Sequence, residues 1–200
     1  PILPPSQVIA QGKMKPLLFA DLNKARREST FPEVRRPQRF IHLHPTLEDL
    51  TAFENEWMPE GSHLSVDIET KTTSITCIGF APSSERALVV PFFDETKPTG
   101  NYWEHKWQEV RAWRWVRHIL TSPKYTVFGH NFSYDSQYLL RQMGIPTQTW
   151  TDDSMLMHHA LQIELEKGLG ILASLYSDEL AWKFMRKRPT SDKTQKRGDD

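Results

Sequence analysis

Cysteine, net charge and long apolar runs are all scarce in this chain of 200 residues. Cys77 is the single cysteine, which excludes a disulfide framework and a cysteine-rich zinc site. The 25 Lys and Arg residues equal the 25 Asp and Glu residues, so bulk electrostatics argue against a protein that coats nucleic acid, although local contacts stay open. No apolar run approaches the roughly 20 residues that cross a bilayer, and no signal peptide is recognisable. These absences predict a soluble, cytoplasmic protein with no membrane partner.

The first 45 residues carry little regular pattern. A short apolar run at 17–20 predicts a strand, and a short helix is expected to begin near Asp21. Three prolines and three arginines make residues 31–45 typical of an extended connector. We therefore expect an extended N-terminal arm and linker over residues 1–45.

A compact domain is expected over residues 46–200. Thr46 is followed by Asp49 three residues later, which resembles a capping box and predicts the start of a helix. Alternating apolar and polar residues then predict three strands with short links, over residues 64–70, 75–80 and 87–93. A helix, a strand and three further helices are expected over 103–120, 125–129, 132–143, 155–165 and 169–176. This order predicts an α/β fold in which helices flank a mixed sheet.

Two acidic residues share one face of the strand predicted at 64–70. Asp67 and Glu69 lie two positions apart, so both carboxylates project from one side while Ile68 projects from the other. Neighbouring carboxylates on an apolar strand repel each other and lose hydration, and a hard divalent cation would relieve both costs. The alternative is an edge strand with one wet face. The pair alone leaves both interpretations open.

A second polar motif runs from Gly129 to Asp135, between the strand predicted at 125–129 and the helix that follows it. Ligands commonly converge where strands end and helices begin, and the helix dipole favours a carboxylate in the first turn. In the alternative interpretation, Asn131 is an ordinary N-cap and Asp135 an ordinary acid at a helix start.

Taken together, the two motifs resemble those of a known family. Asp-x-Glu on a first strand, followed by Asn-x-x-x-Asp at a helix start, is the pattern of the DEDD 3′-5′ exonucleases, and most resembles the proofreading domain of family A DNA polymerases. Asp67 and Glu69 match the first motif, and Asn131 with Asp135 match the second. The Asp-Ser-Met-Leu segment that begins at Asp153 is similar to a third stretch of those polymerases. The resemblance implies a ribonuclease H-like α/β fold.

The resemblance covers about residues 62–185 and implies hydrolysis of the 3′-terminal phosphodiester of DNA with two divalent cations, Mg²⁺ or Mn²⁺. Asp67, Glu69 and Asp135 would be the catalytic and metal-binding carboxylates, with Asp67 shared between the two ions. The pocket for the terminal nucleotide would be shaped by Thr70, Asn131, Phe132 and Tyr134. The implied partners are a single-stranded 3′ end of DNA and a polymerase domain in the same polypeptide.

One part of the family pattern is not found. The fourth carboxylate belongs to a Tyr-x-x-x-Asp or His-x-x-x-x-Asp motif, and neither occurs after Asp135. The chain also begins at Pro1 and ends within a polar run. We therefore expect an excerpt of a longer polypeptide that stops before the last motif, with weak or absent turnover. The alternative function is a catalytically incomplete ribonuclease H-like module with a structural or DNA-binding role, and a ribonuclease of the same superfamily is also open.

The first 25 residues resemble the closing segment of uracil-DNA glycosylases, in which a His-Pro-Ser/Ala motif stands where this chain has Pro4 or Pro5. Some phage polymerases are similar to a fusion of such a domain with an exonuclease. The likeness implies a phage-type replication protein, located in the cytoplasm of the host cell.

Basic and aromatic residues allow two interpretations each. A basic run late in the chain includes Arg186, Lys187 and Arg188, which would contact DNA phosphates or else form a solvated loop. Four of the seven tryptophans lie between residues 103 and 115. They could stack on bases, but packing of a helix on the sheet explains most of them more simply.

Overall fold

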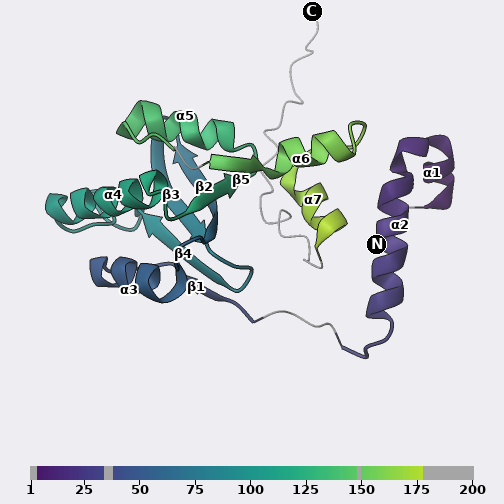
Figure 1. Ribbon diagram of the computed structural model, residues 1–200, viewed down its shortest axis with the longest axis horizontal. Coiled ribbons are helices and arrows are strands. Elements are labelled where there is room, and N and C mark those ends of the chain that lie inside the picture. Colours follow the sequence, from purple (N-terminus) through teal and green to yellow (C-terminus); the bar gives the residue numbers. More distant parts are fainter. Residues whose placement is uncertain (1–3, 34–37, 148–149, 178–200) are drawn as a thin grey trace, which may run out of the picture. The chain divides into compact units, whose positions relative to one another are not determined.

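The computed structural model describes residues 4–33, 38–147 and 150–177 (Figure 1). These residues form two compact units. One holds the described residues up to Pro32 and from Gln162 onward, and the other runs from Glu33 to Leu161. None of the helices in these ranges is long and apolar enough to cross a membrane.

The first unit is helical. Its elements are α1 (Pro5–Ala10), the short 3-10 turn η1 (Gly12–Met14), α2 (Lys15–Glu28) and α7 (Leu169–Tyr176). Lys24 on α2 donates a hydrogen bond to the carbonyl of Ser177 at 3.2 Å, which ties α2 to the end of α7. The strand predicted at 17–20 is therefore wrong, and the arm is helical rather than extended over most of residues 5–28. Pro16 lies in the first turn of α2, where its fixed φ favours a helix start.

The second unit is a mixed sheet covered by helices. Its elements are β1 (Phe40–His42), α3 (Leu47–Trp57), β2 (His63–Lys71), β3 (Ser74–Ala81), β4 (Arg86–Pro91), α4 (Lys106–Thr121), β5 (Thr126–Gly129), α5 (Phe132–Met143), β6 (Trp150–Asp153) and α6 (Ser154–Leu161). The strand order is β1-β4-β3-β2-β5-β6. Strands β2, β3 and β4 pair antiparallel, whereas β1 with β4, β2 with β5 and β5 with β6 pair parallel. The predicted α/β fold with a mixed sheet is confirmed.

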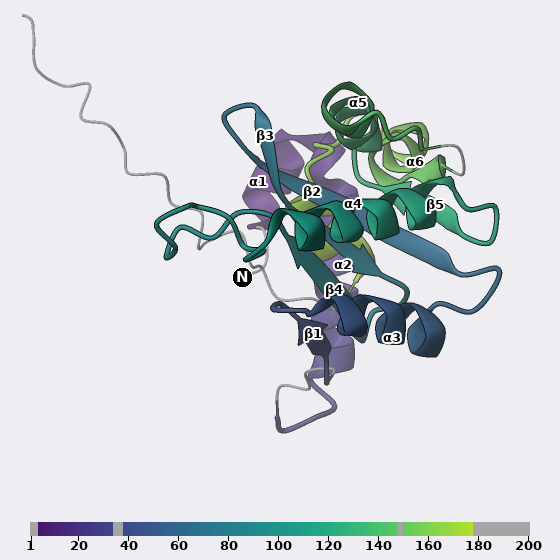
Figure 2. The same ribbon diagram turned by 90° about the vertical axis from the view of Figure 1, so that its left-hand side faces the viewer.

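Helices α3, α4 and α5 cover one face of this sheet (Figures 1 and 2). On the central strand β2, the alternate residues Leu64, Val66 and Ile68 are buried in the core beneath them. The helix side of the core includes Val116 and Ile119 of α4, which are fully buried. Because side chains alternate along a strand, Asp67 and Glu69 project from the opposite face.

Most of the predicted boundaries hold, but two short strands were not predicted. β1 lies inside the expected extended connector and pairs in register with β4. β6 pairs with β5 just before the Asp-Ser-Met-Leu segment. The helix predicted from residue 103 begins at Lys106, and the helix predicted to end at 165 ends at Leu161. The capping box is confirmed, because Thr46 and Asp49 exchange hydrogen bonds at 2.8 and 3.2 Å.

The tryptophans of α4 that face the sheet pack against it. Trp113 stacks on Phe92 with ring centroids 3.8 Å apart, and Trp115 meets Phe80 edge to face at 5.3 Å. Packing therefore accounts for Trp113 and for the side of Trp115 that faces the sheet, as in the simpler interpretation of the sequence, while Trp115 also lines a groove between α3 and α4.

A mostly buried carboxylate joins α3 to the end of α4. Glu54 accepts hydrogen bonds from the Trp115 indole at 2.9 Å and the Tyr125 hydroxyl at 3.0 Å, and lies 3.1 Å from His118. Burial, followed by the contact with Glu54, raises the pKa of Tyr125 to about 12. The carboxylate thus satisfies polar groups that the core would otherwise leave without an acceptor.

Glu54→Ala is expected to lower the free energy of unfolding by about 2 kcal/mol, because two partly buried donors lose their acceptor. Urea unfolding would measure this. Glu56→Ala on the same helix is the control, since Glu56 is exposed, and it should unfold near the wild-type midpoint. Equal shifts in the two variants would contradict a special role for Glu54.

Candidate active site

The β2 carboxylates lie on the sheet face that α3, α4 and α5 do not cover. Asp67 and Glu69 are both exposed, and the pairing with β3 shifts by a β-bulge directly after Glu69. Gly79 stands opposite Asp67 on β3. A Cβ built at Gly79 would meet no atom closer than the Asp67 carbonyl oxygen, at 3.8 Å. The glycine therefore leaves open space beside the Asp67 side chain.

The single cysteine lies close to the negative charges of β2. Cys77 stands opposite Glu69 in the β2–β3 pairing. Burial raises the pKa of its thiol, and the negative charges of Glu69 and Asp67 raise it further. Negative charge is thus concentrated on this part of the sheet.

A hydrogen bond to Asp135 joins the second motif to the first. Asp135 lies in the first turn of α5 with 4% of its surface exposed, and its Oδ1 accepts a hydrogen bond from the backbone N–H of Ile68 at 2.9 Å. Ile68 is the residue between Asp67 and Glu69. The structure therefore brings the two motifs together, with the Asp135 carboxylate held on the strand that carries the other two.

Burial makes Asp135 a weaker acid than an ordinary aspartate. It raises the pKa of Asp135 to about 6, and the charges of Asp67 and Asp153 act in the same direction, while the Ile68 N–H opposes them. The charged form of Asp135 is therefore less favourable than that of an ordinary aspartate, and a nearby positive charge would stabilise it. A divalent cation would supply that charge.

The start of α5 is built by a residue from elsewhere in the chain. Asn131 occupies the N-cap position in the left-handed conformation, at φ 58°, which Asn tolerates better than most residues, and its side chain makes no capping hydrogen bond. Asp153 caps the helix instead, accepting from the backbone N–H groups of Asn131 at 3.0 Å and Phe132 at 2.8 Å. The interpretation of Asn131 as an ordinary capping side chain is wrong.

Asp153 also caps the next helix. Its Oδ1 accepts from the backbone N–H groups of Met155 at 2.9 Å and Leu156 at 3.4 Å, and the residue is only 5% exposed. One carboxylate therefore accepts hydrogen bonds from N–H groups at the starts of both α5 and α6, which have no partner within their own helix. The sequence pattern alone predicts no role for Asp153. An Asp directly before a helix signals a cap, but the second helix it serves is 22 residues earlier in sequence.

The residues expected to shape a nucleotide pocket have different positions. The Thr70 hydroxyl and the Tyr134 hydroxyl are 3.2 Å apart, and Tyr134 is 46% exposed. The backbone of Asn131 is held by Asp153, and its side chain is exposed. Phe132 has no exposed surface and packs edge to face on Trp150, so it belongs to the core that supports α5. Thr70 and Tyr134 are thus the pair that the structure brings together.

Gly129 makes the packing of Phe132 feasible. A Cβ at Gly129 would lie 2.6 Å from the Phe132 ring, closer than real Cβ atoms come. The glycine lets the chain turn from β5 into α5 directly over this ring, which fixes where the first turn of α5 and Asp135 lie. The expected phosphate-contacting residues Arg186, Lys187 and Arg188 lie outside the described residues.

Within residues 4–33, 38–147 and 150–177, no group of three or more His, Cys, Asp or Glu side chains is arranged to hold a metal ion. The partial arrangement nevertheless fits a cation. Asp67 lies close enough to Asp135 for its negative charge to raise the pKa of Asp135. Carboxylate oxygens are the ligands that Mg²⁺ and Mn²⁺ prefer.

Most of the chain matches a known protein family. A family described as 3′-5′ exonuclease matches residues 44–197, which is well over half of the chain and includes both carboxylate motifs. The chain belongs to this 3′-5′ exonuclease family. No curated protein matches the chain.

Solved structures share the exonuclease fold. The Aedes aegypti Nibbler EXO domain is 11% identical, with a TM-score of 0.52 over 82% of this chain and 80% of that one. A structure described as "apo form of the nuclease" is 13% identical, with a TM-score of 0.51 over 76% of this chain and 67% of that one. Escherichia coli RNase D is 16% identical, with a TM-score of 0.50 over 76% of this chain but only 36% of its own length. At these identities the likeness shows the fold, which is ribonuclease H-like.

Proposed function

We propose that the chain removes nucleotides from the single-stranded 3′ end of DNA, as the proofreading part of a phage-type family A DNA polymerase. The observation that carries this proposal is the hydrogen bond from the Ile68 N–H to Asp135, which unites the Asp-x-Glu strand with the Asn-x-x-x-Asp helix. The order of these motifs supports the polymerase context, because it most resembles the proofreading domains of that family.

Three carboxylates would bind the two divalent cations. Asp67 and Glu69 would hold one Mg²⁺ or Mn²⁺, and Asp67 with Asp135 the other. Such ions lower the pKa of a bound water and stabilise the charge on the leaving oxygen. Burial makes the charged form of Asp135 costly, and a bound cation would offset that cost. Asp153 positions Asp135 by fixing the first turn of α5.

The terminal nucleotide would be held at the end of β2. The hydrogen-bonded hydroxyls of Thr70 and Tyr134 lie one residue beyond Glu69 on β2 and one residue before Asp135 on α5. The exposed ring of Tyr134 lies beside Tyr138, with ring centroids 4.8 Å apart, and presents an aromatic surface to a base. Asn131, which is exposed at the start of α5, would be the third side chain beside the terminal nucleotide.

Digestion of a 5′-labelled single-stranded DNA in Mn²⁺ tests the function. The wild-type chain should shorten the DNA slowly, one nucleotide at a time, and Asp67→Ala/Glu69→Ala should leave it intact. The reason is that the variant keeps the fold but loses two of the three carboxylates. A variant as active as wild type would contradict the proposal, and a wild-type chain that leaves the DNA intact even at equimolar concentration would favour the non-catalytic alternative below. The same assay on RNA of equal sequence tests the choice of DNA, since RNase D is described as an exoribonuclease.

A second candidate function is a non-catalytic, DNA-binding module of the same fold. It is favoured by one observation, that the described residues contain no group of three ligands arranged for a metal. A module of this kind has no need to bind a cation at Asp67. Titration with Mn²⁺ therefore separates the two functions.

A further inference from the structure

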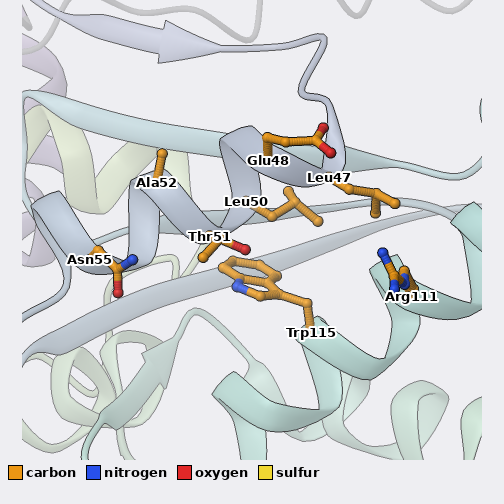
Figure 3. A pocket seen from close by; sticks show the side chains of 8 residues that line it. All are labelled: Leu47, Glu48, Leu50, Thr51, Ala52, Asn55, Arg111 and Trp115. Carbon is orange, nitrogen blue, oxygen red and sulfur yellow. The ribbon is translucent and has the colours of Figure 1, made fainter.

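A groove of about 650 Å³ lies between α3 and α4, on the helix-covered side of the sheet (Figure 3). Glu48, Thr51 and Asn55 line it from α3, and Arg111 and Trp115 line it from α4. Apolar side chains of α3 complete the wall. The site is distinct from the carboxylates, because Asp67 and Glu69 project from the other face of β2.

Arg111 belongs to a basic face of α4. Arg111 and Arg114 are exposed and lie one helical turn apart. Arg117 is also exposed, but its guanidinium donates a hydrogen bond to the Gly144 carbonyl at 3.2 Å, just after α5. In the part of the chain that the structure describes, none of them forms an ion pair with a carboxylate. Trp107, which is 54% exposed, lies at the start of this face with the Arg111 guanidinium 5.6 Å from its ring. Lys106 on the same helix pairs with Glu109, so the arginines give α4 an excess of positive charge.

The groove and the basic face suit one kind of ligand. Arginine guanidinium groups bind phosphate oxygens in bidentate fashion, and two exposed arginines one helical turn apart suit successive phosphates of one strand. The groove, beside them, offers the ring of Trp115 for stacking and the hydroxyl, amide and carboxylate of Thr51, Asn55 and Glu48 for hydrogen bonds. Its negative wall at Glu48 repels phosphate but accepts hydrogen bonds from base amino groups.

The orientation of the indole supports this assignment. The Trp115 N–H is already bonded to Glu54, which fixes the ring at the wall of the groove, where it faces Thr51 and Leu50 (Figure 3). A ring held in this way needs no ordering when a flat ligand enters. The groove therefore favours an unpaired base, with its phosphates directed toward α4.

We propose that the α3–α4 groove, together with Arg111 and Arg114 of α4, forms a second binding site for single-stranded nucleic acid, separate from the carboxylate site. The site takes one unpaired base against Trp115 and the neighbouring phosphates on Arg111 and Arg114. A base paired in a duplex cannot enter the groove. The site therefore discriminates single strands from duplexes, whatever reaction occurs at Asp67.

Binding of a fluorescein-labelled single-stranded DNA 15-mer in EDTA tests the site without any nuclease activity. Arg111→Gln/Arg114→Gln should raise the Kd about tenfold and reduce the slope of log K against log salt by about 1.4, because two phosphate contacts are lost. Lys13→Gln/Arg26→Gln, which removes the same charge from exposed positions in the first unit, should bind like wild type. Equal loss in the two double variants would overturn the proposal.

Filling the groove tests the base-binding half of the site. Ala52 is exposed and lines the groove, so Ala52→Trp occupies the space without changing charge. The variant should bind single strands several-fold more weakly, bind duplex DNA as wild type does, and melt at the wild-type temperature. Unchanged single-strand binding, or displacement of the DNA by polyglutamate as readily as by unlabelled DNA, would show that the face is only a general polyanion or acidic-protein surface.

Discussion

Asp135→Asn is expected to raise the melting temperature at pH 7 in the absence of divalent cations while removing exonuclease activity. The pKa of Asp135 is raised from 3.8 to about 6, so the folded state holds its proton more tightly than the unfolded state. The stability that this gives is present below about pH 4 and is lost as the pH rises toward 6. At pH 7 the buried charge is a net cost, which Asn removes, and the Asn Oδ1 still accepts from the Ile68 N–H.

The gain should be about 1 to 2 kcal/mol after allowance for solvent screening, or several degrees in melting temperature for a chain of this size. Thermal unfolding in EDTA at pH 7 and pH 4 measures it, and the gain should largely vanish at pH 4. Asp94→Asn is the matched control, because hydrogen bonds from Thr96 lower the pKa of Asp94 and its neutralisation should give no gain. Asp135→Asn melting below wild type at pH 7 would contradict the burial of an unfavourable charge.

Asp153→Ala should have the largest effect on stability among the substitutions considered. The carboxylate accepts from four backbone N–H groups at the starts of α5 and α6, and Ala accepts from none. Losing two helix caps at a buried position should lower the free energy of unfolding by about 2 to 4 kcal/mol. Urea unfolding at constant pH provides the measurement.

Asp153→Asn gives a graded comparison at the same position. It keeps one acceptor oxygen where Asp has two, so its stability should fall between wild type and Asp153→Ala. Because α5 carries Asp135, both variants should also weaken Mn²⁺ binding at temperatures where they remain folded. An Asp153→Ala variant that unfolds with wild-type stability would show that water or neighbouring groups cap both helices.

Local patterns predicted the sheet and the first carboxylates. The alternation of β2 is enough to place Asp67 and Glu69 on one face, because the period of a strand is fixed by its geometry. The start of α5 could be predicted from the Gly129 to Asp135 motif. The resemblance to a known family supplied the connection between the two motifs, which lie far apart in sequence.

Long-range features could not be predicted from local pattern. β1 and β6 have only three and four residues, too few to show a period, and each is defined by parallel pairing with a distant strand. The burial of Asp135 and the double capping by Asp153 depend on how α5 packs on the sheet. The apolar run at 17–20 favoured a strand, whereas Pro16 and the residues after it favour the helix observed as α2.

The carboxylates of β2 and α5 are together expected to bind a divalent cation. Titration with Mn²⁺, with free Mn²⁺ followed by its electron paramagnetic resonance signal at pH 7, tests this claim most directly. Wild type should bind Mn²⁺, Asp67→Ala and Asp135→Asn should each bind it at least about tenfold more weakly, and Asp94→Asn should bind as wild type does. A wild-type chain that leaves the Mn²⁺ signal unchanged, or Asp67 and Asp135 variants that bind as tightly as wild type, would contradict the account.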